Sequence, residues 1–315
     1  MIQRFTRSVS VVLVILALLS ASSCSIVHVI RSPGVSRLSK SEFQEIAWAP
    51  DGATILALSI PAAPGIDSNI FGIGFPTGEV KMLPIAFNWF AHPSWSPSGS
   101  QLAIIIGLNS IWLLDPVNGT ASYLTEGEAA AWSEDGKQLL VYVGNLTDRD
   151  ASERKLRIVA LDGSIQKTVS LGEMRTKEWS SEYISGLSLS VDGTRVAYSI
   201  FSIPQDEPNT HEAFIADIAS GIVHRFQPSE QVGQMVWAPD GESIAYIRFG
   251  SSDYLGELVI ADPAGTCLFK PPLPPEIRSI SWSPDGSMIA FTSYGGIYIL
   301  DLASARQNTQ QGEGC

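Results

Sequence analysis

The sequence predicts an all-β protein, a six-bladed β-propeller of four-stranded antiparallel blades whose ring is closed by an N-terminal strand. Three observations carry this prediction. A strand–turn–strand pattern recurs six times, the segments after each turn follow a common order, and the last repeat lacks its fourth strand. Repeats of this length that consist of strands and turns are typical of propeller blades rather than of helical solenoids.

The clearest copy of the pattern is residues 280–286, ISWSPDG. Its alternation of small and aromatic residues favours a strand, and the apolar run Ile289–Phe291 favours a second one. Between the two, Pro284 presets φ for a turn, Asp285 can bond its own backbone, and Gly286 accepts the left-handed conformation. The pattern therefore predicts a β-hairpin.

The other five copies begin at residues 46, 93, 130, 187 and 235, and successive aromatic positions lie 37 to 57 residues apart. The fourth copy departs most, with Leu189 in place of Trp and Val191 in place of Pro. We interpret the repeated residues as framework that places strands and blades. They are Trp48, Trp95, Trp132, Trp237 and Trp282, with Asp51, Gly52, Asp240, Gly241, Asp285 and Gly286 in the turns.

Each hairpin is followed by a third strand, such as residues 110–115, and a fourth, such as residues 121–125. Four such strands make one twisted blade. After Leu302, however, the chain is polar and unpatterned, whereas Val35–Ser39 is a strand candidate with no partner nearby. We expect Val35–Ser39 to complete the sixth blade and close the ring, which leaves no long exposed edge.

The first residues predict a targeting segment. Arg4 and Arg7 precede the apolar run Val9–Leu19, and small residues follow it, which is typical of a secretory signal. The run is short for a membrane-spanning helix. The expected organisation is a signal peptide (1–23), a lipidated Cys24 with a tether (24–33), the propeller (34–303) and a polar tail (304–315).

Residues 21–24, ASSC, resemble the bacterial lipobox, in which the chain is cut before a cysteine that becomes lipid-modified. Ala21 departs from the pattern, because a branched aliphatic residue is more usual there. The resemblance implies a lipid-anchored protein of the bacterial cell envelope, outside the cytoplasm. Ser25 after the cysteine would favour the outer membrane in a bacterium with two membranes. An ordinary signal peptide with an incidental cysteine is the alternative.

The hairpins, the second strand at Ile289–Phe291 and the third strand at residues 296–301, GIYILD, together resemble the TolB-type β-propeller repeat. The resemblance covers residues 34–302. It implies a six-bladed ring in which the Trp hairpin is framework, and it says little about activity. TolB carries an additional N-terminal α/β domain that we do not expect here. The chain is therefore expected to be TolB-like, without TolB's own partners.

Composition narrows the class of partner. The chain has 315 residues, is 45% hydrophobic and has a formal net charge of −12, which argues against nucleic acid. Its four histidines lack metal-ligand spacing, so neither a metal nor a cofactor is predicted. Cys267 and Cys315 could pair in an oxidising compartment. A buried thiol and a frayed chain end are the alternative.

The topology predicts where a binding site lies. The tight turns should gather on one face and the long connections on the other, and propellers place recognition on such loops. The long connections are expected at Ile60–Asn69, Pro84–Pro93, Val143–Lys155, Leu171–Ile184, Phe201–Glu212 and Lys270–Arg278.

Several residues of these connections suit binding, because Trp, Tyr and Arg dominate interface energetics. Packing between blades is the alternative role for the aromatic residues, and a solvated surface is the alternative for the charged ones. The candidate binding residues are Trp89, Phe90, His92, Asp148, Arg149, Arg154, Trp179 and Tyr183.

The chain contains no serine elbow, dinucleotide loop or other complete catalytic motif, so no catalytic residue is predicted. The predicted function is that of a scaffold that binds a protein or peptide of the cell envelope. A receptor for a small molecule or glycan at the channel mouth is one alternative. A hydrolase or lyase with a site assembled from distant blades is another, and its mark would be His, Asp and Arg side chains that converge at the channel mouth.

Overall fold

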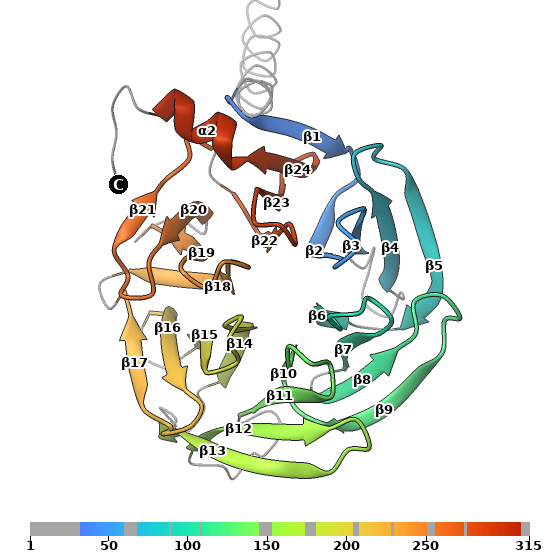
Figure 1. The fold of residues 1–315 in the computed structure, drawn as a ribbon, viewed down its shortest axis with the longest axis vertical. Helices are drawn as coiled ribbons and strands as arrows, with labels where there is room; N and C mark the ends of the chain where they lie inside the picture. Colours follow the sequence, from blue (N-terminus) through green and yellow to red (C-terminus); the bar gives the residue numbers. More distant parts are fainter. Residues whose placement is uncertain are drawn as a thin grey trace, which may run out of the picture.

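The computed structural model describes residues 32–59, 68–87, 90–107, 109–144, 153–173, 181–203, 208–227, 230–250, 256–273 and 276–309. These form six separate four-stranded antiparallel sheets, arranged as the blades of a ring around a central axis (Figure 1). The predicted fold class is confirmed.

The blades are numbered in chain order, and the strands of each blade are given in order from the channel to the outer edge. Blades 1 and 2 comprise β2 (Phe43–Trp48), β3 (Thr54–Ser59), β4 (Ser68–Gly74), β5 (Val80–Phe87), β6 (Phe90–Trp95), β7 (Leu102–Ile106), β8 (Ser110–Leu114) and β9 (Ala121–Glu126). Blades 3 and 4 comprise β10 (Ala129–Trp132), β11 (Gln138–Val143), β12 (Glu153–Ala160), β13 (Ile165–Glu173), β14 (Ser181–Leu189), β15 (Arg195–Ile203), β16 (Thr210–Asp217) and β17 (Val223–Phe226). Blades 5 and 6 comprise β18 (Gln231–Trp237), β19 (Ile244–Phe249), β20 (Gly256–Ala261), β21 (Cys267–Phe269), β22 (Ser279–Trp282), β23 (Met288–Ser293), β24 (Gly296–Asp301) and β1 (Val35–Ser39).

The N-terminal strand closes the ring. β1 pairs antiparallel with β24, with Val35 opposite Leu300 and Ser39 opposite Ile297 (Figure 1). The backbone N–H of Asp301 also donates to the carbonyl of Gly34, at 2.7 Å. The prediction that β1 supplies the missing fourth strand is therefore confirmed.

The C-terminal segment differs from the expected unpatterned tail, because it begins with the helix α2 (Leu302–Thr309). Asp301 caps this helix: its carboxylate accepts the backbone N–H of Ser304 at 2.7 Å. Leu302 and Ala305 are buried against the apolar core of blades 5 and 6. Within residues 302–307, only Leu302 and Ala305 are buried, which is too few to give the sequence a helical pattern.

Apolar residues fill the spaces between neighbouring blades. The second strands contribute Tyr198, Tyr246 and Phe291 at equivalent positions, and all three side chains are almost completely buried. At the closure, Trp48 and Ile55 of blade 1 pack with Ala290 and other residues of blade 6. Blades 6 and 1 are thus joined by the same kind of core as the other neighbours.

The antiparallel order gives the ring two faces. The turns between first and second strands and between third and fourth strands lie on one side, which we call the hairpin face. The remaining connections begin and end on the other side, which we call the loop face. Most connections of the loop face are shorter than the sequence predicted, since β5 and β6 leave only residues 88–89 between them, and β12 begins at Glu153. The connection between β21 and β22 has the predicted bounds, residues 270–278.

Among the described residues, none of the helices combines the length and apolar character that a membrane span requires.

Candidate binding site at the channel mouth

One position of the repeat forms a ring around the central channel. It lies three residues before the Trp of each hairpin, or before Leu189 in blade 4, and each of the six residues at this position lines one or both of two cavities on the axis. We call this set the waist ring. Its members are Glu45, His92, Ala129, Gly186, Gln234 and Ser279.

Two cavities meet at the waist ring. The channel cavity, of about 120 Å³, is enclosed by the innermost strands of all six blades. The mouth cavity, of about 150 Å³, opens toward the loop face. Glu45, His92 and Gln234 line both cavities and so mark the boundary between them.

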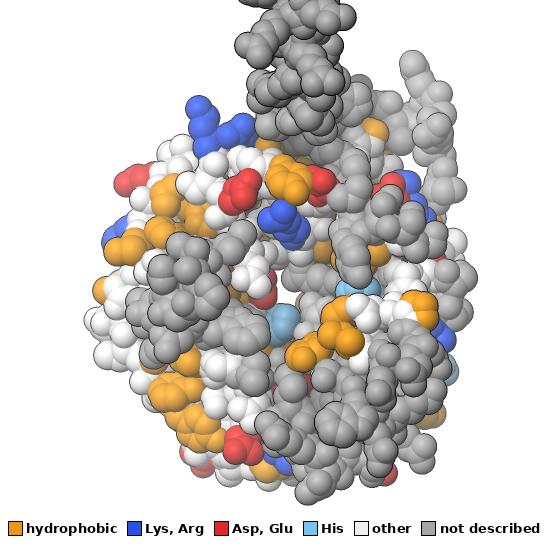
Figure 2. Space-filling model, turned by 180° about the vertical axis from the view of Figure 1, so that it is seen from behind, with side chains coloured by type: hydrophobic (Ala, Val, Ile, Leu, Met, Phe, Trp, Pro, Cys, Tyr) orange, Lys and Arg blue, Asp and Glu red, His pale blue; other side chains and the backbone are white. Residues whose placement is uncertain are grey.

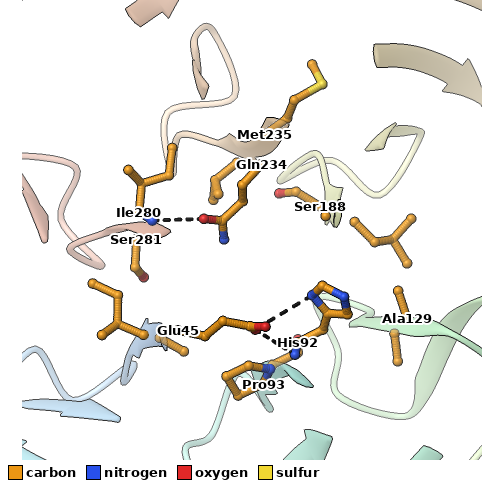
Figure 3. Close-up of a pocket in the computed structure, with 16 residues that line it drawn as sticks. Glu45, His92, Pro93, Ala129, Ser188, Gln234, Met235, Ile280 and Ser281 are labelled. Carbon is orange, nitrogen blue, oxygen red and sulfur yellow. Dashed lines mark hydrogen bonds and ion pairs between the residues drawn. The ribbon is translucent and has the colours of Figure 1, made fainter. Parts of the chain in front are cut away.

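Side chains of the waist ring also bond to the backbone of the next blade. The Oε2 atom of Glu45 accepts the N–H of His92 at 2.7 Å, and the Oε1 atom of Gln234 accepts the N–H of Ile280 at 2.8 Å (Figure 3). These bonds satisfy N–H groups of the innermost strands, which have no further strand beside them. The waist ring therefore joins adjacent blades and lines the channel at the same time.

His92 has an unusual backbone. Its φ is 51°, in the left-handed region, and it lies in a bulge where the pairing of β6 with β7 shifts between Ala91 and Ser94. Its Nδ1 atom lies 3.6 Å from Oε2 of Glu45. A non-glycine residue in this region persists only where its surroundings hold it, and such residues cluster at functional sites.

The polar atoms of the waist ring are open to the channel. The side chains of Glu45 and His92 are 19% and 25% exposed. Oε1 of Glu45 receives no hydrogen bond from the described part of the chain, because both contacts with His92 use Oε2. The amide nitrogen of Gln234 points into the channel, since its oxygen is bonded to Ile280 (Figure 3).

His211 forms an aromatic wall of the mouth cavity. Its ring lies between Phe201 and Phe249, with ring centroids 4.5 Å and 4.8 Å away. Its backbone N–H donates to Oε1 of Gln231 at 2.6 Å. Burial lowers the pKa of His211 to about 4, so the imidazole is neutral at neutral pH. This wall is apolar in character rather than charged.

Arg278 supplies the positive charge of the mouth cavity. It is exposed, and its guanidinium carbon lies 5.0 Å from the ring centroid of Tyr294, in cation–π geometry. Within the described part of the chain it makes no ion pair. Figure 2 shows this face, on which histidine and acidic side chains lie beside an opening near the centre.

The structure describes only some of the predicted binding residues. Trp89, Asp148, Arg149 and Trp179 lie outside the described residues, as does the predicted lipidation residue Cys24. Of the others, His92 reaches the channel. Phe90 begins β6 and pairs with Ile106, and Tyr183 lies half-buried in β14 opposite Phe201.

Arg154 belongs to strand β12 rather than to the connection before it, and it is 6% exposed. It donates to both carboxylate oxygens of Glu182 in blade 4, with Nη2–Oε1 at 2.9 Å and Nε–Oε2 at 3.2 Å. Burial alone would lower the Arg154 pKa, but the bond to Glu182 outweighs it and raises that pKa. The binding role proposed for Arg154 remains a prediction, and the geometry gives it a role between blades.

The framework Trp residues join blades through their indole groups. The indole N–H of Trp132 donates to the carbonyl of Ser94 in the preceding blade at 2.9 Å, and Trp95 and Trp282 make the equivalent bonds to Ala47 and Val236. By contrast, the buried indole N–H groups of Trp48 and Trp237 have no hydrogen-bond partner among the described residues.

The turn residues have the roles that the sequence predicts. Each of the turn carboxylates accepts the N–H of the residue two positions on, at 2.8 Å for Asp51 and Asp240 and 3.0 Å for Asp285. The glycines that follow them have φ near 70°, as the hairpin turn requires.

Comparison with solved structures identifies the fold. A candidate TolB from Agrobacterium tumefaciens aligns with a TM-score of 0.58 at 17% identity, over 82% of this chain and 90% of that chain. TolB from Acinetobacter baumannii gives 0.51 at 16% identity, over 82% and 63%. Hydrazine synthase of Kuenenia stuttgartiensis gives 0.57 at 14% identity, over 87% and 97%.

No protein-family model and no curated protein sequence matches the chain. The structural matches confirm a TolB-like propeller fold. Since the proteins matched include both TolB and a synthase, the likeness extends to the fold and leaves function to be argued from the site.

Sequence reasoning missed Glu45, Gln234, His211 and Arg278. The first two had a signal, because aligning the six hairpins on their Trp places Glu45, His92 and Gln234 in one column. His211 and Arg278 also had a signal, since they lie within the predicted long connections Phe201–Glu212 and Lys270–Arg278, but neither was among the candidate binding residues.

The assembled site combines charged, polar and aromatic groups. One carboxylate, one imidazole, one amide and one guanidinium converge at the mouth, together with the aromatic wall. Within the described ranges, no group of three or more His, Cys, Asp or Glu side chains is arranged to hold a metal ion.

Proposed function

We propose that the protein is a lipid-anchored binding scaffold of the bacterial cell envelope, and that it binds a protein or peptide through its loop face. The observation that carries the proposal is the waist ring, in which His92 is held in a strained conformation by Glu45 at the mouth of the channel. Such preorganisation favours a binding role over a purely structural one.

The size of the cavities supports a macromolecular partner. Pockets for small molecules usually measure about 300–1,000 Å³. The channel and mouth cavities measure about 120 Å³ and 150 Å³, which is enough for a single inserted side chain. The remainder of such an interface would have to form on the surrounding loop face.

The sequence supports a location in the cell envelope. The signal-like residues 1–23 and the lipobox-like residues 21–24 stand directly before the tether that leads into β1. Replacement of Cys24 by serine should move the protein from the membrane fraction to the soluble fraction of lysed cells. Unchanged fractionation with unchanged mass of the N-terminal peptide argues against the anchor.

Affinity capture tests the binding role. The full chain, cross-linked in intact cells and recovered from solubilised envelope, should bring down one partner, and Trp89→Ala with Trp179→Ala should reduce its recovery. Tyr123→Ala is the matched control, because Tyr123 is 53% exposed on the outermost strand of blade 2, away from the loop face. No partner, or equal loss with the control, contradicts the proposal.

An enzyme with a distributed site is the second candidate. The observation in its favour is the convergence of His92, Glu45 and Arg278 at the mouth, since a carboxylate that orients an imidazole is a common general-base arrangement. Turnover of ester, amide or glycoside substrates by the wild type, and its loss in His92→Gln, would favour this candidate over the scaffold.

A further inference from the structure

The charge at the waist ring identifies the kind of side chain that fits it. Of the sixteen residues that line the channel cavity, Glu45 is the only one with a carboxylate and none is Lys or Arg. Oε1 of Glu45 is unbonded within the described part of the chain. The carboxylate end of the Glu45 side chain points toward the centre of the channel (Figure 3). A partly enclosed carboxylate oxygen without a donor is stabilised by an incoming cation.

The surroundings of Glu45 complete the recognition surface. Ser188 and Ser281 also line the channel cavity, and their hydroxyl oxygens can accept a further hydrogen bond. Ile247 and Phe249 in the mouth cavity offer apolar contact for an alkyl chain on its way to the carboxylate. The formal net charge of −12 on the whole chain attracts a basic partner over a longer range.

We propose that the channel mouth receives one basic side chain of the partner, a lysine or an arginine, whose charged end bonds to Oε1 of Glu45. This inference rests on the proposed function and adds the chemistry of the contact. Arg278 stands at the rim of the mouth cavity, stacked on Tyr294, and does not line the channel cavity. Arg278 is therefore placed to affect the entry of the partner's side chain, and it does not contact the charged end that bonds to Glu45.

The test uses the full chain in detergent micelles, labelled with ¹⁵N at its four histidines. The probe is the peptide acetyl-Gly-Lys-Gly-amide, with norleucine or glutamate in place of lysine in two comparison peptides. The lysine peptide should shift the backbone amide signal of His92 saturably, because that N–H is bonded to Glu45. The norleucine peptide should leave the signal unchanged.

Glu45→Gln is the decisive variant. Glutamine keeps an oxygen that can accept the His92 N–H, so the bulge is retained while the charge is removed. We expect its dissociation constant for the lysine peptide to rise about 10-fold or more, as for the loss of a charged hydrogen bond. Glu134→Gln is the matched control, because it removes one carboxylate from an exposed hairpin turn outside both cavities, and it should bind the lysine peptide as tightly as the wild type.

Three outcomes overturn the inference: no saturable shift with lysine at the solubility limit of the probe, unchanged affinity in Glu45→Gln, or binding of the glutamate peptide that is lost in Arg278→Gln. The last outcome would assign an acidic side chain to the site. If the partner is captured from the envelope equally well by Glu45→Gln and wild type, the inference fails and the scaffold function stands. If no partner is captured, the function fails independently of the peptide result.

Discussion

The indole N–H of Trp132 donates to the backbone carbonyl of Ser94 at 2.9 Å, across the boundary between blades 3 and 2. The bond gives the Trp of the hairpin a second role besides packing. It fixes the position of one blade's first strand against that of its neighbour. Trp48 occupies the equivalent position in blade 1, and its indole N–H has no such partner among the described residues.

This pair gives a direct test of the framework role. Trp132→Phe removes the bond to the part-buried carbonyl of Ser94, so it should lower the free energy of unfolding by about 1–2 kcal/mol more than Trp48→Phe. Urea denaturation followed by circular dichroism measures both. Equal losses in the two variants would mean that packing alone accounts for the role of the Trp.

Because β1 closes the ring, deletion of β1 should strongly lower the thermal stability of the protein. Deletion of residues 34–40 takes away the strand that pairs with β24 and leaves the edge of blade 6 open. The melting temperature should fall markedly, or the protein should aggregate. A chain with residues 26–30 deleted keeps β1 and is the control. A melting temperature that is equal in both deletions would refute closure by β1.

The ion pair between Arg154 and Glu182 predicts an effect on stability. Arg154→Ala removes both hydrogen bonds of the ion pair from the buried Glu182 carboxylate, so the free energy of unfolding should fall by about 3–5 kcal/mol. Arg157→Ala, on the same strand and only half-buried, should cost much less. Chemical denaturation of both variants distinguishes this role from one in partner binding, for which the two variants would be equally stable.

The lowered pKa of His211 should make the free energy of unfolding depend on pH. The His211 pKa falls from 6.5 to about 4 on folding, because burial disfavours the imidazolium. The unfolded chain therefore binds a proton between pH 6.5 and 4 that the folded chain does not. The contribution to stability is complete above pH 6.5 and is lost progressively as the pH falls to about 4, by up to about 3 kcal/mol at about 1.4 kcal/mol per pKa unit.

Denaturation of His211→Phe at pH 7 and pH 4.5 measures this term. The phenylalanine should keep the stack with Phe201 and Phe249, and the variant should lose less stability than the wild type on acidification. His224→Phe, at an exposed site on β17, serves as the control and should behave as the wild type does. A wild-type loss no greater than that of His211→Phe would contradict the assignment.

The disulfide bond of Cys267 predicts a covalent link to a second cysteine of the chain. Cys267 is therefore not the free thiol that the sequence left open as an alternative. Because Cys24 is the predicted site of lipidation, we expect Cys315 to be its partner. Peptide mapping without reduction should recover the two peptides joined. Cys315→Ser should expose the Cys267 thiol to maleimide, whereas Cys24→Ser should not, and the reverse pattern would assign Cys24.

The sequence by itself determined the blades. Turns such as Pro284-Asp285-Gly286 act through the local backbone, and alternating residues set the register of each strand, so both can be read from neighbouring positions in the chain. The missing fourth strand of blade 6 and the unpaired Val35–Ser39 even determined the closure of the ring. The sequence did not predict the helix α2, because too few of its residues are apolar to give a helical pattern.

Only the tertiary structure decided how the residues of the site are brought together. Glu45 and His92 are separated by a whole blade in sequence, and only the circular order of the blades brings the carboxylate to the backbone N–H that holds His92 in its strained conformation. Arg154 reads from the sequence as an exposed loop residue, yet its partner Glu182 comes from the next blade and makes it part of the core. Hydrogen bonds and charges act through space, so residues that adjacent blades bring together leave little trace in the order of the chain.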